Sequence, residues 1–491
     1  MIITGRRRLE RAMEQASSYE EWKEAALALD HKGGLDRWKL LDQSRRYDYV
    51  SIRVRLDRLR ALRARHDNLG LLFNLNEGIH GNMGGMGRSV LYDKANFGTK
   101  KLVVDYVDEI ASALEHLARP EVDEISFEEK LDFFRRADHC FGRSAFMMSG
   151  SGSLLFFHIG VAKTLLQKGL LPKVLSGSSG GSFVGSLLST HHDDQLLEML
   201  EPENLITRLE QEAGYFSRLS KFKPQIMPDD ERREIAAHFI PDLTFQEAFA
   251  LTGRQLNVSI APAETHQKSR LLNAITSPNV FIREAILASG AVPGVYAPVT
   301  LRAKNHHGEK QAYLPSRKWV DGSVSDDMPA KRLARLYGVN HYIVSQTNPH
   351  VIPFVDSGMK KQNAFALFRE ASVSTARAWV NAGASSIEKP LSLSPTLTRA
   401  TSIALSVINQ DYIGDINILP SNKFFNPFRL LAYLNEKEIR GLISAGERAA
   451  WPKVEMMRIQ TRISRVLTGI LADYDEEHVR QLRSTRMRKA G

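Results

Sequence analysis

The chain has 491 residues, of which 43% are hydrophobic and 25% are charged. This is an ordinary globular composition, and the length is sufficient for two or three domains. The formal net charge of +10 favours anionic partners, phospholipid surfaces and acidic ligands as much as nucleic acids. The single cysteine, Cys140, excludes an intramolecular disulfide, so folding does not require an oxidising compartment.

No segment of the sequence predicts secretion or a membrane span. The arginines at residues 6–8 are followed after one leucine by Glu10, so the apolar core of a signal peptide is missing. The most apolar stretch, residues 154–166, contains His158 and Lys163 and is shorter than the ~20 residues that a spanning helix needs. We therefore expect a cytoplasmic protein whose contact with a membrane or lipid surface is peripheral.

Residues 1–143 are strongly charged and have aromatic and leucine side chains at helical spacing, which predicts a mainly helical N-terminal domain. A glycine-rich interruption at residues 80–87 predicts a loop. Such a loop could bind phosphate or could simply connect two helices. The connector is favoured, because no Lys-Ser/Thr pair follows the glycines as it does in a P-loop.

From residue 144 the pattern changes to alternating strands and helices, which is typical of a mostly parallel α/β sheet. We assign residues 144–350 to this domain and residues 351–491 to a helical C-terminal region with a basic tail. The elements predicted in the α/β domain are strands at 144–149, 173–176, 255–261, 318–320 and 341–346, and helices at 154–168 and 182–190.

A G-x-S-x-G pentapeptide at residues 177–181 lies directly between a predicted strand and a predicted helix. In such an elbow the nucleophile adopts a cramped backbone conformation, for which Gly177 and Gly181 leave room. Ser179 is therefore the candidate nucleophile, at a helix N-terminus that favours developing negative charge. The alternative is a glycine-serine turn that only caps the helix. The strand before it and the helix after it favour the nucleophile.

A second glycine-serine run, at residues 149–153, ends one predicted strand and begins the next helix. Consecutive backbone amides in such a loop can converge on an anion and form an oxyanion hole. A dinucleotide-binding fingerprint would need a glycine at Leu155 and an acidic residue at Ser176, and both are missing. The candidate oxyanion-hole residues are Gly150, Ser151, Gly152 and Ser153.

A serine nucleophile needs a base, and the sequence offers Asp321 or a histidine. Asp321 ends a predicted apolar strand and is followed by Gly322, so its carboxylate can face the same crevice as Ser179. Desolvation can raise its pKa enough for it to accept the hydroxyl proton. A Ser-Asp-His order remains open with His341 or His350. Asp321 could also be only a turn or cap residue.

The combination of these motifs, in this order, resembles the patatin-like phospholipases. The similarity covers residues 149–162, residues 177–181 and Asp321 with Gly322, and it extends to residues 288–294, which resemble the segment leading into the substrate crevice of the family. Residues 15–145 are similar to the N-terminal domain of the fungal and plant triacylglycerol lipases of this family.

The resemblance implies a three-layer α/β/α fold and a Ser-Asp dyad, with Ser179 as nucleophile and Asp321 as base. It implies backbone oxyanion donors, a lipid acyl ester as substrate, and neither a metal nor an organic cofactor. One departure concerns the glycine loop, in which Ser151 and Leu155 stand where the family usually has glycines. The change at Leu155 bears on the shape of the pocket more than on the chemistry.

Three further expectations concern the partners and the activity of the chain. Aromatic and basic residues at 360–379 and 424–428 would suit an anionic lipid interface, although core packing explains the first segment as well. A lipid acyltransferase on the same dyad and a non-catalytic lipid-binding protein remain alternatives to a hydrolase. No nucleic-acid partner is expected, because no recognised motif accompanies the basic charge.

Overall fold

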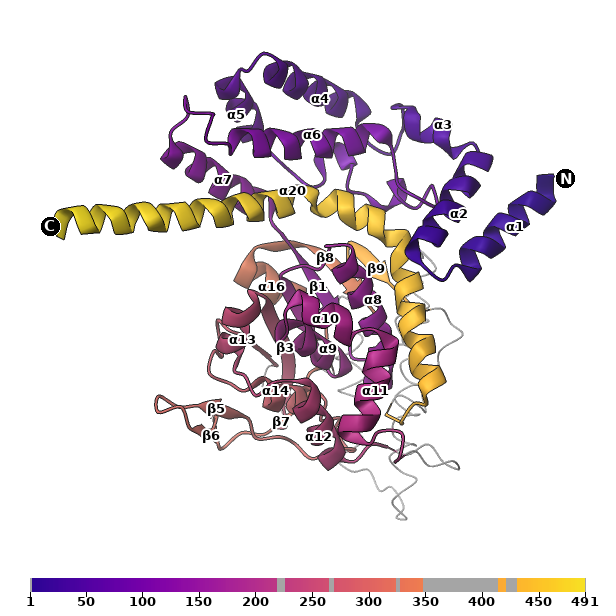
Figure 1. Ribbon diagram of the computed structural model, residues 1–491, viewed down its shortest axis with the longest axis vertical. Helices are drawn as coiled ribbons and strands as arrows, with labels where there is room; N and C mark the ends of the chain where they lie inside the picture. The colour runs from indigo at the N-terminus through magenta and orange to yellow at the C-terminus, as the bar shows by residue number, and fades with distance from the viewer. Residues whose placement is uncertain are drawn as a thin grey trace. The chain divides into compact units, whose positions relative to one another are not determined.

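The computed structural model of the chain describes residues 2–218, 226–264, 269–323, 327–347, 414–420 and 431–490 (Figure 1). The chain divides into two compact units. The first combines Met1–Ser144 with Trp451–Gly491, and the second is Ala145–Ala450. The long last helix, α20 (Glu436–Ala490), therefore contributes to both units. The predicted lipid-facing segments at 360–379 and 424–428, and His350, lie outside the described residues.

The first unit is helical, as its sequence predicts. Its central helix is α6, which buries a continuous apolar side that both α4 and α5 contact. Side-chain oxygens cap the first turns of four helices, which explains where these helices begin; the caps are Ser18, Asp48, Asp67 and Ser126. The helices are α1 (Ile2–Gln15), α2 (Tyr19–Lys32), α3 (Leu35–Leu40), α4 (Tyr49–Ala64), α5 (Asn68–Asn76), α6 (Lys101–Leu117) and α7 (Phe127–Phe141), with single 3-10 turns at Met83–Gly85 and Ser89–Leu91.

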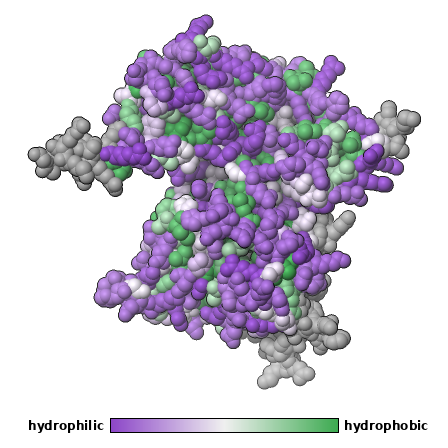
Figure 2. Space-filling model, viewed as in Figure 1, coloured by the Kyte–Doolittle hydropathy of each residue, from purple (hydrophilic) through white to green (hydrophobic). Residues whose placement is uncertain are grey.

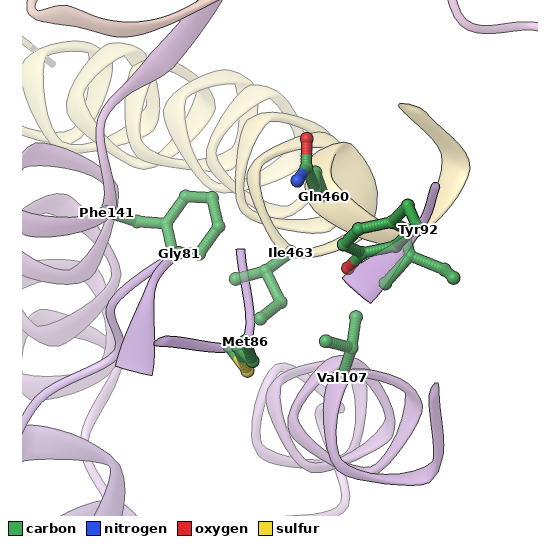
Figure 3. A pocket seen from close by; sticks show the side chains of 8 residues that line it. Gly81, Met86, Tyr92, Val107, Phe141, Gln460 and Ile463 are labelled. Carbon is green, nitrogen blue, oxygen red and sulfur yellow. The ribbon is translucent and has the colours of Figure 1, made fainter. Parts of the chain in front are cut away.

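The glycine-rich run at residues 80–87 is a loop, as predicted. It borders a small pocket whose lining is mainly apolar, including Met86, Val107 and Phe141, and which Figure 3 shows from close by. The polar contacts of the loop remain within the unit, since the carbonyl oxygen of Gly87 accepts a 2.8 Å hydrogen bond from Gln460. No lysine or arginine lines the pocket. This lining favours the interpretation of the loop as a connector over a phosphate site.

The second unit contains a seven-stranded sheet in the order β4-β3-β2-β1-β8-β9, with β7 also paired to β3. β1, β2 and β3 are parallel, as are β8 and β9, whereas β4 and β7 run antiparallel to β3. The strands are β1 (Arg143–Met148), β2 (Val174–Gly177), β3 (Gln255–Pro262), β4 (Arg270–Leu272), β7 (Trp319–Asp321), β8 (Val339–Ser345) and β9 (Ile416–Ile418), and a separate hairpin consists of β5 (Arg302–Lys304) and β6 (Lys310–Ala312).

Helices cover both faces of the sheet, as the contacts of two successive residues of β1 show. Met147 packs in one apolar cluster with Leu333 of α16, whereas Met148 faces Gly185 of α9. Because successive strand residues point to opposite faces, α16 and α9 lie on opposite sides. The three-layer α/β/α prediction is confirmed. The helices are α8 (Leu155–Gln167), preceded by a 3-10 turn (Gly152–Leu154), α9 (Gly180–Ser189), α10 (Asp193–Met199), α11 (Pro202–Ala213), α12 (Asp229–Phe239), α13 (Phe245–Thr252), α14 (Ile282–Ser289) and α16 (Ala330–Tyr337).

The first part of α20 packs against α8 with backbone close to backbone. A Cβ atom placed at Gly446 would overlap the carbonyl oxygen of Phe157, and one placed at Gly160 would overlap that of Ile443. Lys163 adds a buried ion pair to Glu447 at 2.9 Å. Gly160 and Gly446 therefore allow the short distance between α8 and α20. This packing holds α8 in place where it follows the glycine-serine loop.

A buried histidine connects that loop to β8. His158 of α8 lies 2.7 Å from the hydroxyl of Ser345 through Nδ1 and 3.1 Å from the carbonyl oxygen of Ser149 through Nε2. The amide of Ser149 also donates to the carbonyl of Ser345 at 3.1 Å. Burial lowers the pKa of His158 to about 4, only partly opposed by the bond to Ser149, so the ring is neutral at physiological pH.

Substitution of Gly446 by alanine is expected to destabilise the second unit by about 1–3 kcal/mol, because the added methyl group forces α20 away from α8. Gly469→Ala is the matched control, since it lies in the same helix with nothing within 4 Å of the added atom, and it should be neutral or stabilising by up to about 1 kcal/mol. Urea unfolding measures both. Equal effects of the two substitutions would contradict close α8–α20 packing.

The low pKa of His158 predicts a loss of stability in acid. Between the unfolded value of 6.5 and the folded value of about 4, the unfolded chain binds a proton that the folded chain excludes. The free energy of unfolding should therefore fall by about 3 kcal/mol as pH decreases through this window. In a His158→Asn variant, urea unfolding from about pH 7 to about pH 5 should show a shallower pH dependence. An unchanged slope would show that His158 is not the responsible group.

Candidate active site

Ser179 occupies a strained turn between β2 and α9. Its backbone has φ 49° and ψ −122°, a conformation that residues other than glycine rarely adopt. The backbone around the elbow leaves no room for a side chain at Gly177 or Gly181. A Cβ atom at Gly177 would overlap the carbonyl of Gly181, and one at Gly181 would lie 2.5 Å from the carbonyl oxygen of Met148. The G-x-S-x-G run thus forms the predicted strand-turn-helix elbow, with Ser179 only half-buried.

A second serine supports the elbow from behind. The amide of Ser179 donates to the hydroxyl of Ser289 at 2.9 Å, and that hydroxyl donates to the carbonyl of Ser259 in β3 at 2.7 Å. The strained residue is thereby fixed to the sheet through its own backbone. Ser289 lies in the 288–294 segment, but its role was not predicted. No local pattern distinguishes it from any other small residue at a helix end.

Asp321 reaches the elbow from an unexpected direction. Ile260 of β3 pairs with β4 on one side and with Asp321 of β7 on the other. β7 and β4 therefore lie on opposite sides of β3. That is the side of β2, whose pairing with β3 ends at Gly177 opposite Val258. Asp321 therefore lies two residues beyond the end of β2, at the level of Ser179. β7 thus runs antiparallel to β3, and the carboxylate at its end faces the elbow.

Gly322 makes this approach possible. A Cβ atom at this position would overlap the backbone of Ser259, so only glycine allows the chain to cross β3 so closely. The amide of Asp321 donates to the carbonyl of Ala291 at 3.0 Å, and the amide of Ser323 donates to Oδ1 of Asp321 at 2.8 Å. The backbone on both sides of the carboxylate is consequently fixed.

Asp321 is buried and its side chain shares a hydrogen bond with that of Ser179. Burial raises the pKa of Asp321 above its usual value of 3.8, because the charged form loses its hydration. Hydrogen bonds from Ser323 and Ser179 and the positive charge of Arg232 lower the pKa and partly offset this rise. The result is a carboxylate more basic than an exposed aspartate, in contact with a serine hydroxyl.

Arg232 of α12 is a charged residue near the dyad that sequence analysis missed, because it belongs to no motif. Its guanidinium stacks on the ring of Tyr296 at 3.9 Å and donates to the carbonyl oxygen of Leu287 at 3.3 Å. It lies against Gly290, next to the residue whose carbonyl binds the amide of Asp321. The cation is therefore held in place by α14 and its following segment.

The glycine-serine loop lies against the residue that follows the nucleophile. A Cβ atom at Gly180 would overlap the hydroxyl of Ser151 and lie 2.8 Å from the carbonyl oxygen of Gly152. Gly152 has φ +50°, which explains the glycine at that position. The hydroxyl of Ser151 is buried and has no hydrogen-bond partner among the described residues. Leu155 is the first residue of α8 and is half-buried.

One of the predicted oxyanion donors is already engaged. The amide of Gly150 donates to the buried carboxylate of Asp327 at 2.8 Å. It therefore cannot also donate to an oxyanion in this arrangement, and the expectation for Gly150 is corrected to a structural role. The candidate amides that remain belong to Ser151, Gly152 and Ser153.

The histidine alternatives receive no support from the described residues. His341 lies in β8, four residues or about 13 Å along the strand from Ser345, the end that contacts the glycine-serine loop. His158 is used in the buried bridge between Ser345 and Ser149. Within the described ranges, no histidine forms a hydrogen bond with Ser179. In the same ranges, no three His, Cys, Asp or Glu side chains are grouped so that they could hold a metal ion.

Two family models match the chain. The family model described as "Patatin-like phospholipase" matches residues 146–334, and the one described as "Domain of unknown function (DUF3336)" matches residues 2–139. Among solved structures, VipD from Legionella pneumophila aligns at 13% identity and a TM-score of 0.28, covering 62% of this chain and 67% of that chain. That likeness is too weak to bear on fold or function.

Several similar curated proteins come from fungi. Triacylglycerol lipase ptl2 of Schizosaccharomyces pombe is 32% identical over 478 residues, covering 94% of this chain and 75% of that protein. Triacylglycerol lipase 4 of Saccharomyces cerevisiae is 32% identical, covering 91% of this chain and 51% of that protein. A patatin-like phospholipase domain-containing protein of Lodderomyces elongisporus is 33% identical, covering 94% and 59%. The chain thus spans about half to three quarters of the length of these relatives. It belongs to the patatin-like phospholipase family, in the group that carries the DUF3336 domain before the patatin domain.

Proposed function

We propose that the chain hydrolyses lipid acyl esters through a Ser-Asp dyad. The observation that carries the proposal is the placement of the buried Asp321 carboxylate beside Ser179, which lies in a strained elbow and whose side chain lowers the pKa of that carboxylate. The names of the relatives, triacylglycerol lipase and patatin-like phospholipase, support an acylglycerol or a phospholipid as substrate.

The first half of the reaction forms an acyl-enzyme. Asp321 accepts the hydroxyl proton while Ser179 Oγ attacks the ester carbonyl carbon, which gives a tetrahedral oxyanion. Backbone amides of the loop at Ser151, Gly152 and Ser153, together with the N-terminus of α9, stabilise this negative charge. The C–O bond to the alcohol then breaks, and protonated Asp321 returns the proton to the departing alkoxide.

The second half releases the fatty acid. Asp321 accepts a proton from water while the water oxygen attacks the acyl carbon, and the proton returns to Ser179 as the acyl-enzyme collapses. The raised pKa of Asp321 suits both steps, because a base of higher pKa takes the proton more readily. If a second lipid replaced water in this half, the same dyad would act as an acyltransferase.

Ser179→Ala and Asp321→Asn should each lower the hydrolysis of an emulsified acylglycerol or a short-chain ester by about a thousandfold or more, since one removes the nucleophile and the other the base. Labelling by a fluorophosphonate probe should disappear in Ser179→Ala. Product analysis with an added diacylglycerol acceptor separates transfer from hydrolysis. Turnover retained by either purified variant would refute the dyad, and a wild-type chain that is not labelled would favour a non-catalytic lipid-binding protein.

Stability provides the folding control for these variants. The pKa of Asp321 is higher in the folded state, so the folded chain retains a proton that the unfolded chain releases as pH rises above the unfolded value. Ionisation of Asp321 therefore destabilises the fold at neutral pH. We expect Asp321→Asn to unfold at a higher temperature than wild type at pH 7, so that its loss of activity cannot result from misfolding.

The charge of Arg232 should be visible in the pH profile. The kcat/KM of wild type should fall on the acid side with a midpoint above the ordinary aspartate value, because Asp321 acts only when ionised. Arg232→Gln removes a cation that stabilises this ionised form, so the midpoint should move to higher pH. Arg232→Lys retains the charge and is the matched control. A midpoint that is unchanged in Arg232→Gln would mean that this charge does not influence Asp321.

A further inference from the structure

Exposed apolar side chains are concentrated in one part of the first unit. Of the thirteen large apolar residues that are exposed among the described residues, eight lie within residues 27–90. Six of these lie between residues 40 and 73, and each side chain is 52–65% exposed. The density in this short segment requires an explanation, whereas single exposed apolar residues elsewhere do not. The six residues are Leu40, Leu41, Val50, Val54, Leu69 and Phe73.

The centre of this region is the outward side of α4. The helix buries Ile52, Leu56 and Leu59, which are spaced to face α6. Residues on the opposite side follow at intervals of four, four and seven: Val50, Val54, Arg58 and Arg65. All four are exposed, and together they are called the α4 outer stripe.

The other exposed apolar residues flank the ends of this stripe. Leu40 and Leu41 immediately precede Asp42, whose carboxylate accepts a 2.9 Å hydrogen bond from Arg53, the neighbour of Val54. Leu69 and Phe73 lie on α5, which contacts α4 after a short turn. The exposed apolar residues therefore lie on consecutive elements of the chain, from the end of α3 through α4 to α5.

The same part of the chain is also more basic than the rest of residues 1–144. Residues 1–144 hold 25 basic and 24 acidic side chains and are nearly neutral, but residues 35–65 hold ten basic and four acidic ones, a net charge of +6. Arg53 is paired with Asp42, and Arg63 with Glu109. Arg58 and Arg65 of the stripe form no ion pair among the described residues.

We infer that the α4 outer stripe docks the chain on an anionic phospholipid surface. Apolar side chains on a helix lying flat enter the boundary between headgroups and acyl chains, while arginines reach the phosphates. The inference rests on the proposed function, which requires access to lipid, but it concerns binding alone. It adds a lipid contact in the DUF3336 domain to the one expected at residues 360–379 and 424–428, which lie outside the described residues.

The order of side chains along the stripe suits a lipid surface. Two valines, Val50 and Val54, are followed by two arginines, Arg58 and Arg65, so an apolar part and a cationic part lie in line on one side of the helix. Figure 2 shows one face of the molecule, on which apolar residues form small patches within a largely hydrophilic surface. A fluid anionic interface accommodates such a pattern, because each side chain finds its own depth in the lipid.

The test measures binding of the full chain to vesicles in the Ser179→Ala background, so that no lipid is consumed. Flotation with vesicles of phosphatidylcholine plus phosphatidylserine should exceed flotation with phosphatidylcholine alone, and salt should weaken it. Val50→Asp with Val54→Asp should lower the partition coefficient about tenfold or more. Arg58→Glu with Arg65→Glu should also lower it about tenfold or more, since each arginine contributes about fivefold.

Leu251→Asp with Arg335→Glu, exposed residues of the second unit, is the matched control and should leave binding unchanged. Thermal unfolding confirms that each variant is folded. Equal vesicle binding by the stripe variants and the control would overturn the inference. Absence of vesicle binding by the chain with an unchanged stripe would also overturn it, and is the result expected if the stripe docks a protein. Because binding is measured without turnover, a failed dyad leaves this result intact, and a failed stripe leaves hydrolysis of a soluble ester intact.

Discussion

The position of Asp321 beside Ser179 depends on an exchange of neighbours along one side of β3. β2 pairs with β3 as far as Gly177 and then turns into the elbow, and β7 occupies the same side of β3 from Ile260 onward. Ser179 and Asp321 meet because β2 leaves the side of β3 where β7 arrives. Gly322 and the Ser289 bridge are consequences of this exchange, since each lets the chain approach β3 at Ser259 without a gap.

The parts of this arrangement that could be predicted are those encoded locally. Strand-helix alternation located β1, β2, β3, β7 and β8 to within about two residues, and glycine spacing identified the elbow, because both depend on neighbouring residues in the chain. The direction of β7 could not be predicted. A three-residue strand has no periodicity that distinguishes parallel from antiparallel pairing, and the choice is made by tertiary contacts. Ser289, Arg232 and the pairing of Gly150 with Asp327 were missed for the same reason.

The site concentrates features that lower stability. Ser179 has a positive φ, Asp321 is a buried acid with a raised pKa, and the hydroxyl of Ser151 is buried without a partner among the described residues. Each is unfavourable by itself. The surrounding structure offsets them through the close α8–α20 contact at Gly160 and the His158 bridge, which stand immediately behind the glycine-serine loop. The contacts that stabilise this unit thus lie next to the loop and the elbow that form the candidate site.

A dyad places a heavier demand on its carboxylate than a triad does. In a Ser-His-Asp triad the histidine transfers the proton and the aspartate only orients it, so the two tasks are divided. Here no histidine orients Asp321, and three backbone contacts hold it: its amide on Ala291, the Ser323 amide on its carboxylate, and Gly322 against β3. Its basicity must come from burial, moderated by Arg232. The burial that excludes water from Asp321 is therefore also the cause of the raised pKa that the proposed role as base requires.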